Sequence, residues 1–298
     1  MMETEIIEKY EKAGKIAKHA IEFSKELVKE GALILDIAEQ VEKKIIELGG
    51  KPACPVSISI NNMAAHYTPK FEERTVLKKG DVVKLDLSTQ VDGYIADTAY
   101  TCEIETKKWS NLIKASEEAL HSALKIIKPG ISISEVGAVI EKEIRKYGYV
   151  PITDLSGHSL EQYELHGGMQ IPNFNNNSNQ VIEDGTILAI EPFATNGIGG
   201  VTEINDFEIF RIKEAKPVRL PVARKILEYA ADEYQTLPFA KRWLTKKLGT
   251  FGIETGLKEL ARAGALHQYP ALKESGNGIV SQHEHTIIVL NKPIVTTL

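Results

Sequence analysis

Cysteine is scarce in this sequence, which has only Cys54 and Cys102 among 298 residues. Two cysteines cannot build a disulfide framework, and these two lack the paired spacing of a zinc knuckle, so a reducing compartment is expected. Long apolar runs are also missing. The N-terminus, MMETEIIEKYEK, lacks the apolar core of a signal peptide, and no segment reaches membrane-spanning length. We therefore expect a cytoplasmic protein with no membrane partner.

A strong excess of one charge is absent too. The formal net charge is −5 and is spread along the chain, with neither a basic stripe nor an acidic tail. Nucleic acid is therefore not an expected partner. The chain does contain 43% hydrophobic and 26% charged residues, which is enough to bury a large core in one big domain or two smaller ones.

An internal repeat is the main organisational feature. Residues 29–52 align without gaps on residues 128–151, at an offset of 99 residues. Each unit predicts a helix, a glycine stop, a second helix and another glycine stop; the four helices are expected at residues 3–29, 34–48, 110–128 and 133–147. A period this long does not suit a solenoid, so it indicates two related halves around a pseudo-twofold axis, with a site shared between them.

The first half supplies a pair of carboxylates. Asp92-Gly93 suits a two-residue type I′ loop between two expected strands. Such a loop sets the register so that Ser88 opposes Asp97, and Asp86 then lies diagonally across from Asp97 on the same face. Two carboxylates on one sheet face repel each other unless a cation lies between them. The alternative is a solvated polar face.

The second half supplies a matching pair. The strand that ends in Asp86 aligns with ILAIE, which ends in Glu191, at an offset of 105 residues. A lone buried glutamate would be costly. By the same repeat, Glu284 in QHEHT corresponds to Asp97, so we expect four carboxylates to converge.

Three histidines are candidates for the same site. His158 follows Gly157 in LSGHS, where glycine permits a close approach of the backbone. His66 and His166 are 100 residues apart and are approximate equivalents in the repeat, so they could flank the site from the two halves. In each case the alternative is an imidazole that only satisfies local hydrogen bonds.

Five segments together resemble the methionine aminopeptidases: KLDLSTQVDGYIADTA, LSGHSLEQYELHGG, AIEPFAT, QHEHT and NNMAAHYTP. The resemblance spans nearly the whole chain. It implies an α+β pita-bread fold, with residues 1–298 as a single catalytic domain of two pseudo-twofold-related halves, each of helices and antiparallel sheet.

The resemblance also implies a dinuclear metal centre. Asp86 would chelate one ion, His158 and Glu191 would bind the other, and Asp97 and Glu284 would bridge the two. The cofactor is expected to be two divalent metal ions, and this oxygen-rich ligand set suits cobalt, manganese, iron or zinc. Two such ions about 3.5–4 Å apart can hold and activate a water for attack on the scissile carbonyl.

The implied activity is removal of the initiator methionine from nascent polypeptide N-termini with a small second residue, by a monomer. Glu191 would shuttle a proton to the departing amine, while His66 and His166 would bind substrate and stabilise the oxyanion. Where relatives carry an aromatic residue before proline, this chain has Cys54. We expect Cys54 to line a roomier methionine pocket, unless a neighbouring side chain fills the space.

Spacing points to the type of enzyme. Asp86 and Asp97 are 11 residues apart, whereas Glu191 and Glu284 are 93 apart. The extra residues carry helical patterns at 221–236 and 254–264. An inserted helical subdomain distinguishes type 2 enzymes of this family from type 1, and we expect it here at residues 205–270. The short N-terminus favours the archaeal form of type 2. The rival hypothesis is a binding protein of the same fold that has lost its metals, but all five ligand positions are intact.

Overall fold

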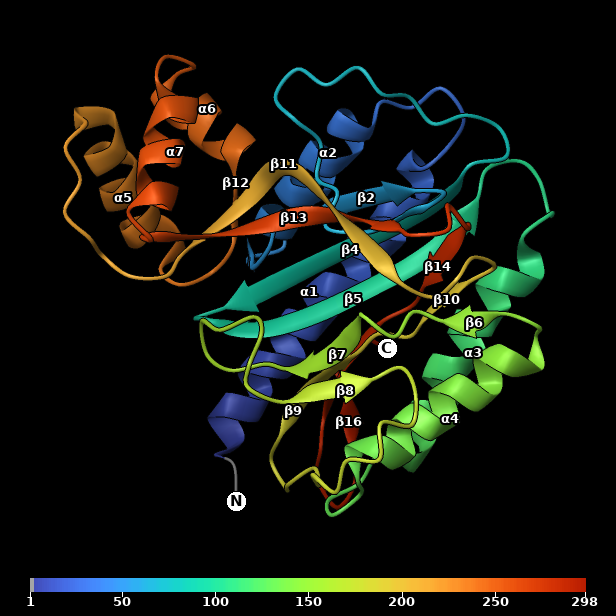
Figure 1. Cartoon of the computed structure of the whole chain (residues 1–298). Helices are drawn as coiled ribbons and strands as arrows, with labels where there is room; N and C mark the ends of the chain where they lie inside the picture. Colours follow the sequence, from blue (N-terminus) through green and yellow to red (C-terminus); the bar gives the residue numbers. More distant parts are fainter. Residues whose placement is uncertain (1–2) are drawn as a thin grey trace.

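The computed structural model describes residues 3–298 and confirms the two halves (Figure 1). The first half contains α1 (Thr4–Leu27), α2 (Ile34–Glu47), β1 (Lys51–Pro52), β2 (Ser57–Ile60), β3 (Met63–Ala65), β4 (Val82–Val91) and β5 (Tyr94–Glu103). The second half begins with α3 (Ser110–Ile126), α4 (Ile133–Lys146), β6 (Val150–Pro151), β7 (Ser156–Ser159), β8 (Gln170–Pro172), β9 (Ile187–Ile190) and β10 (Phe193–Thr195), and ends with β14 (Val280–Gln282), β15 (His285–Ile288) and β16 (Ile294–Val295). The four repeat helices therefore lie within about two residues of their expected bounds.

The repeat is visible in equivalent hydrogen bonds. The Gly31 N–H donates to the Leu77 carbonyl at 2.8 Å, and the Gly130 N–H donates to the Ile182 carbonyl at 2.7 Å. Both glycines have positive φ, 79° and 85°, which suits the stop between the paired helices. The donors are offset by 99 residues and the acceptors by 105, as in the sequence alignment.

The β4–β5 hairpin adopts the predicted register. Val91 opposes Tyr94, and Ser88 opposes Asp97. Asp92 and Gly93 have φ of 53° and 84°, as a type I′ turn requires. The strand pairs of these sheets are antiparallel. In the first half, β4 pairs with β1, β2 and β5. The second half forms a five-stranded sheet in the order β16-β15-β9-β7-β8 and a smaller sheet in the order β14-β10-β6.

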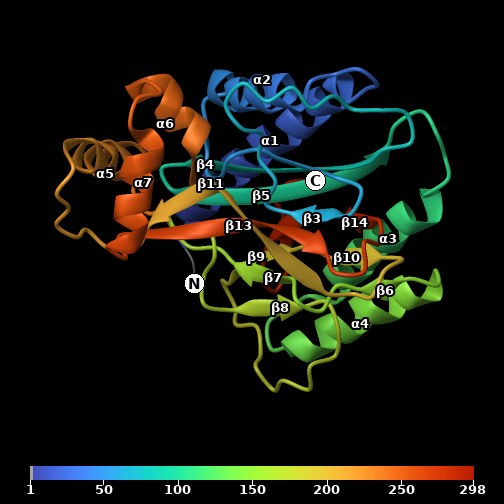
Figure 2. The same cartoon turned by 45° about the horizontal axis from the view of Figure 1, so that its top comes forward.

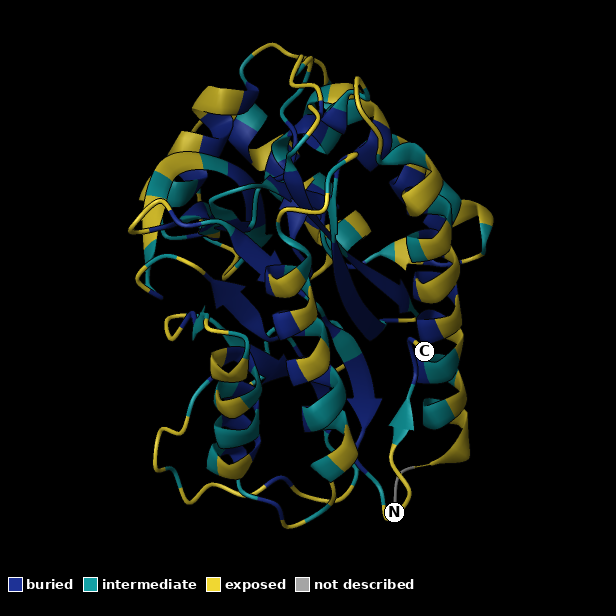
Figure 3. Cartoon of the chain, turned by 90° about the vertical axis from the view of Figure 1, so that its right-hand side faces the viewer, coloured by how far each residue is buried: buried dark blue, intermediate teal, exposed yellow. Residues whose placement is uncertain are grey.

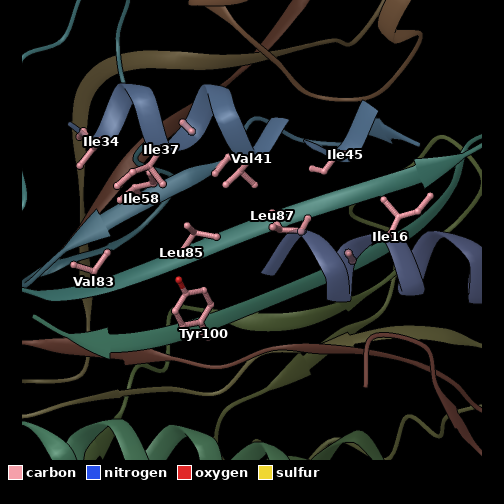
Figure 4. Close-up of a cluster of buried hydrophobic side chains, with 14 of the residues drawn as sticks. Ile16, Ile34, Ile37, Val41, Ile45, Ile58, Val83, Leu85, Leu87 and Tyr100 are labelled. Atoms are coloured by element: carbon pink, nitrogen blue, oxygen red, sulfur yellow. The ribbon is translucent and has the colours of Figure 1, made fainter. Parts of the chain in front are cut away.

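Each half buries its own core between two helices and a sheet. In the first half, Ile37 and Val41 of α2 contact the face of β4 that carries Leu85 and Leu87 (Figure 4). These leucines alternate with Asp86, so one strand has an apolar face toward the helices and a polar face away from them. The helices are exposed on their outer faces and buried toward the strands (Figure 3). No helix of residues 3–298 is long and apolar enough to cross a membrane.

The two halves meet along β5 and β15. Ala99 and Glu284 form an isolated antiparallel bridge. On one side of it, the Thr286 hydroxyl accepts from the Asp97 N–H at 2.7 Å and donates to the Asp97 carbonyl at 2.9 Å. On the other side, the Thr101 hydroxyl makes the same two bonds with the backbone of Gln282, at 2.8 and 2.6 Å. On each side of the Ala99–Glu284 bridge, a threonine hydroxyl therefore makes the two hydrogen bonds to the opposite backbone that a strand residue would otherwise make.

A helical subdomain interrupts the second half. The long strands β11 (Val201–Ile212) and β13 (Leu266–Glu274) pair with each other, and the chain between them forms α5 (Pro221–Tyr234), β12 (Phe239–Ala240), α6 (Lys241–Leu248) and α7 (Ile253–Arg262). The helices project to one side of the two halves (Figure 2). They have a separate apolar core. The sequence patterns indicated α5 and α7 but missed α6.

Candidate active site

The five predicted metal ligands converge on one buried cavity. Asp86 lies in β4, Asp97 in β5 and His158 in β7, while Glu191 follows β9 and Glu284 precedes β15. The cavity has a volume of about 40 Å³, room for only a few water-sized atoms, and all five residues line it. Of the strands that carry or adjoin them, β4, β5, β7 and β9 are labelled in the central part of the molecule in Figure 1.

His158 faces the carboxylates. Its Nε2 lies 3.6 Å from Glu191 Oε1 and 3.9 Å from Asp97 Oδ2. Its Nδ1 lies 3.4 Å from the Ser159 carbonyl oxygen. When the proton of the neutral ring is on Nδ1, the lone pair of Nε2 is free and points into the site. Possible ligand atoms of Asp97, His158 and Glu284 all lie within 4.8 Å of one another. This group can hold a metal ion.

Neutral side chains donate hydrogen bonds to three of the carboxylate oxygens. The Gln282 Nε2 donates to Asp86 Oδ2 at 3.1 Å and to Glu191 Oε2 at 3.4 Å, which joins one carboxylate from each half. The Ser88 hydroxyl donates to Asp97 Oδ1 at 2.8 Å. Gln282 was not predicted as a site residue. Strand alternation was the available signal, because Gln282 and Glu284 are two positions apart and share a face.

Burial and mutual repulsion oppose full ionisation of the four carboxyl groups in the absence of a cation. Burial raises the pKa of Asp86 to about 6, and burial together with neighbouring carboxylates raises the pKa values of Asp97, Glu191 and Glu284 well above their usual range. Burial lowers the pKa of His158 to about 4. Within residues 3–298, no lysine or arginine forms an ion pair with these carboxylates. Divalent cations would remove the repulsion, so the donor set fits metal ions.

The other two predicted histidines lie beside the cluster. The rings of His158 and His166 are 4.5 Å apart between centroids, and Tyr269 contacts both His66 (5.9 Å) and His166 (5.6 Å). Burial lowers the pKa of His66 to about 4 and that of His166 well below its usual range, so both imidazoles are neutral. His66 Nδ1 is buried without a hydrogen-bond partner among residues 3–298.

Part of the cavity lining is apolar. Cys54, half-buried, lines it together with Leu165, Ile209, Pro238 and Tyr269. The last three belong to or border the long hairpin and the helical subdomain. They were not predicted, because their approach to Cys54 depends on contacts between segments more than 150 residues apart.

Comparison with known proteins decides the family. The family model "Metallopeptidase family M24" matches residues 8–215. The chain belongs to metallopeptidase family M24. As an M24 metallopeptidase it uses divalent metal, which accounts for the buried carboxylates.

Relatives of this M24 chain cover its full length. It is 47% identical over 296 residues to the methionine aminopeptidase of Methanocaldococcus jannaschii, with 99% of each chain covered. It is 45% identical to that of Pyrococcus horikoshii, with 98% of this chain and 99% of the relative covered. A methionine aminopeptidase structure from Thermotoga maritima aligns with a TM-score of 0.73 and 23% identity, over 99% and 98% of the chains. This likeness confirms the α+β pita-bread fold.

Proposed function

We propose that this M24 metallopeptidase is a methionine aminopeptidase that removes the initiator methionine from nascent chains and peptides with a small second residue. The observation that carries the proposal is the full-length similarity to the archaeal methionine aminopeptidases, at 47% identity. The five buried ligand candidates around one cavity support it. We further propose the archaeal type 2 form, with residues 205–270 as its characteristic insertion, acting as a cytoplasmic monomer.

The metal centre would hold two divalent ions, of cobalt, manganese, iron or zinc. Asp97 and Glu284 would bridge them, Asp86 would complete one site, and His158 with Glu191 would complete the other. When bound, the ions supply Lewis acidity that activates a water and polarises the scissile carbonyl. Four carboxylates match the charge of two divalent cations, and the single imidazole presents its Nε2 to them.

The protein's own groups position the substrate and move protons. His66 and His166 are neutral and can donate hydrogen bonds to the carbonyl oxygen as negative charge develops on it. Glu191, whose Oε1 lies 3.6 Å from His158 Nε2, would take a proton from the attacking water and pass it to the departing amine.

The cavity would take the N-terminal methionine of the substrate. The carboxylates line the same cavity as Cys54 and Leu165, and these two residues would contact the methionine side chain. The free amine of the substrate would then lie against the carboxylate cluster.

Hydrolysis of Met-Ala-Ser by the metal-loaded protein tests the function. We expect release of free methionine, no cleavage of the N-acetylated peptide, and about two metal ions per chain at full activity. A metal-loaded protein that binds Met-Ala-Ser without cleaving it would support the rival hypothesis of a non-catalytic binding protein.

A further inference from the structure

A buried ion pair connects the helical subdomain to the first half. Arg242, in the first turn of α6, is only 1% exposed, and its Nη2 binds Glu42 Oε1 of α2. Glu42 is 7% exposed, and its other carboxylate oxygen accepts a hydrogen bond from Trp243 Nε1 at 2.9 Å. Two residues of α6 therefore bind one carboxylate that is 200 residues away in sequence.

The same pair binds two further segments. Glu42 Oε1 accepts from the Val56 N–H at 3.1 Å. Arg242 Nη1 donates to Thr68 Oγ1 at 2.5 Å and to the Pro69 carbonyl at 3.3 Å. The Thr68 hydroxyl donates in turn to the Val56 carbonyl at 2.8 Å, which completes a closed ring of contacts.

Each segment that the pair binds also supplies a wall of the cavity. Val56 is two residues from Cys54, Thr68 is two residues from His66, and Arg242 is four residues from Pro238. Cys54, His66 and Pro238 all line the cavity. The Arg242–Glu42 pair is thus the point at which three walls of the site are fixed relative to one another.

The surroundings favour a role in positioning. Arg242 and Glu42 do not line the cavity, so neither touches a substrate there. A second ion pair, Lys246–Glu39, joins the same two helices at 2.5 Å, with side chains 47% and 33% exposed. The Lys246–Glu39 pair is therefore a separate, partly exposed contact between the subdomain and α2, and it binds none of the three wall segments.

We propose that Arg242 and Glu42 are positioning residues that set the width of the methionine pocket by holding its three wall segments together. This inference rests on the proposed function. It assigns part of the methionine preference to the helical subdomain, acting through α2 and without contact with the substrate.

The test compares variants of the buried pair with matched variants of the exposed pair. Arg242→Met, Glu42→Gln and Thr68→Val disrupt the ring of contacts, and Thr68→Val does so while keeping the ion pair and hence the fold. Each should raise KM for Met-Ala-Ser by about tenfold and reduce the preference for methionine over leucine, with kcat changed by no more than about threefold. Lys246→Met and Glu39→Gln should leave both parameters unchanged.

A second readout does not depend on catalysis. In a Cys102→Ser background, Cys54 is the remaining thiol, and its rate of alkylation reports how open the pocket wall is. We expect Thr68→Val and Arg242→Met to increase that rate at least about fivefold in metal-loaded protein, because the wall segment loses its anchor.

The outcomes separate the two proposals. A wild-type protein without activity on Met-Ala-Ser would overturn the function, while the alkylation rates would still test the positioning role. Folded Arg242→Met and Thr68→Val proteins with unchanged KM, unchanged methionine preference and unchanged alkylation would overturn the positioning role. Equal effects in Lys246→Met would overturn it too, because they would show that docking of α6 alone is responsible.

Discussion

Ala99 and Glu284 exchange two backbone hydrogen bonds, at 3.3 and 3.0 Å, across the boundary between the halves of the protein. Glu284 thereby has its backbone fixed to β5, two residues from Asp97. The two carboxylates proposed to bridge the metal ions are therefore supported by one shared piece of backbone, and the halves cannot separate without moving them apart.

Thr286 tests this junction. Thr286→Val removes the hydroxyl that accepts from the Asp97 N–H, and it leaves a buried donor without a partner. We expect a loss of about 1–3 kcal/mol in the free energy of unfolding, measured in urea. Thr286→Ser keeps the hydroxyl and should lose much less. Equal stability of the valine and serine variants would show that the hydroxyl does not hold the halves together.

Removal of metal should abolish turnover, because the proposed mechanism uses a water activated by the metal ions as the nucleophile. Dialysis against a chelator should remove activity, and Mn²⁺, Co²⁺ or Fe²⁺ should restore it. The same ions should raise the unfolding temperature of metal-free protein, since they relieve repulsion among buried carboxylates. Full activity in a sample shown to be metal-free would contradict this mechanism.

Asp97→Asn and His158→Ala should each reduce kcat/KM for Met-Ala-Ser by at least about a hundredfold, since each removes a metal ligand. Asp97→Asn should not unfold the metal-free protein, because it deletes a repelling charge while keeping an oxygen to accept from Ser88. Circular dichroism and metal content would be measured alongside activity. Near-normal turnover at unchanged metal content would show that these residues are not ligands.

Gly157 should be intolerant of a side chain. A Cβ at this position would lie 2.4 Å from the Ala189 carbonyl oxygen, so β7 and β9 would have to move apart next to His158. Gly157→Ala should destabilise the protein by about 1–3 kcal/mol and lower its metal affinity. Gly168→Ala, where the new Cβ meets no atom within 4 Å, is the matched control and should be neutral. Thermal unfolding of both variants decides the point.

Cys54→Phe should narrow the apolar part of the cavity. A ring there adds apolar contact of about 1–3 kcal/mol in a hydrophobic pocket, so KM for methionyl peptides should fall and their preference over other N-termini should sharpen. Values of kcat/KM for Met-, Leu- and Phe-initiated peptides measure the effect. Ratios identical to those of the wild type would mean that Leu165, Ile209 or Tyr269 already fills the space.

The fold was predictable where local chemistry decides it. Asp92-Gly93 fixed the β4–β5 register, and this placed Asp86 and Asp97 on one face without any tertiary information. The repeat then located Glu191. The sequence did not indicate Gln282, Tyr269 or Arg242 as part of the site, because their partners lie far away in sequence and no periodicity relates them. The short helix α6 was missed for the same reason: its place depends on the burial of Arg242.

The long separation between Asp86 and Glu284 also dictates an order of events during folding. The β4–β5 hairpin can form from neighbouring residues, but the Ala99–Glu284 bridge closes a loop of 185 residues and must wait for both halves. Before that closure the first half presents only Asp86 and Asp97, while His158, Glu191 and Glu284 belong to the second half, so neither half alone holds the complete set of proposed ligands. We therefore expect a refolding molecule to bind its metal ions tightly only after its two halves have met.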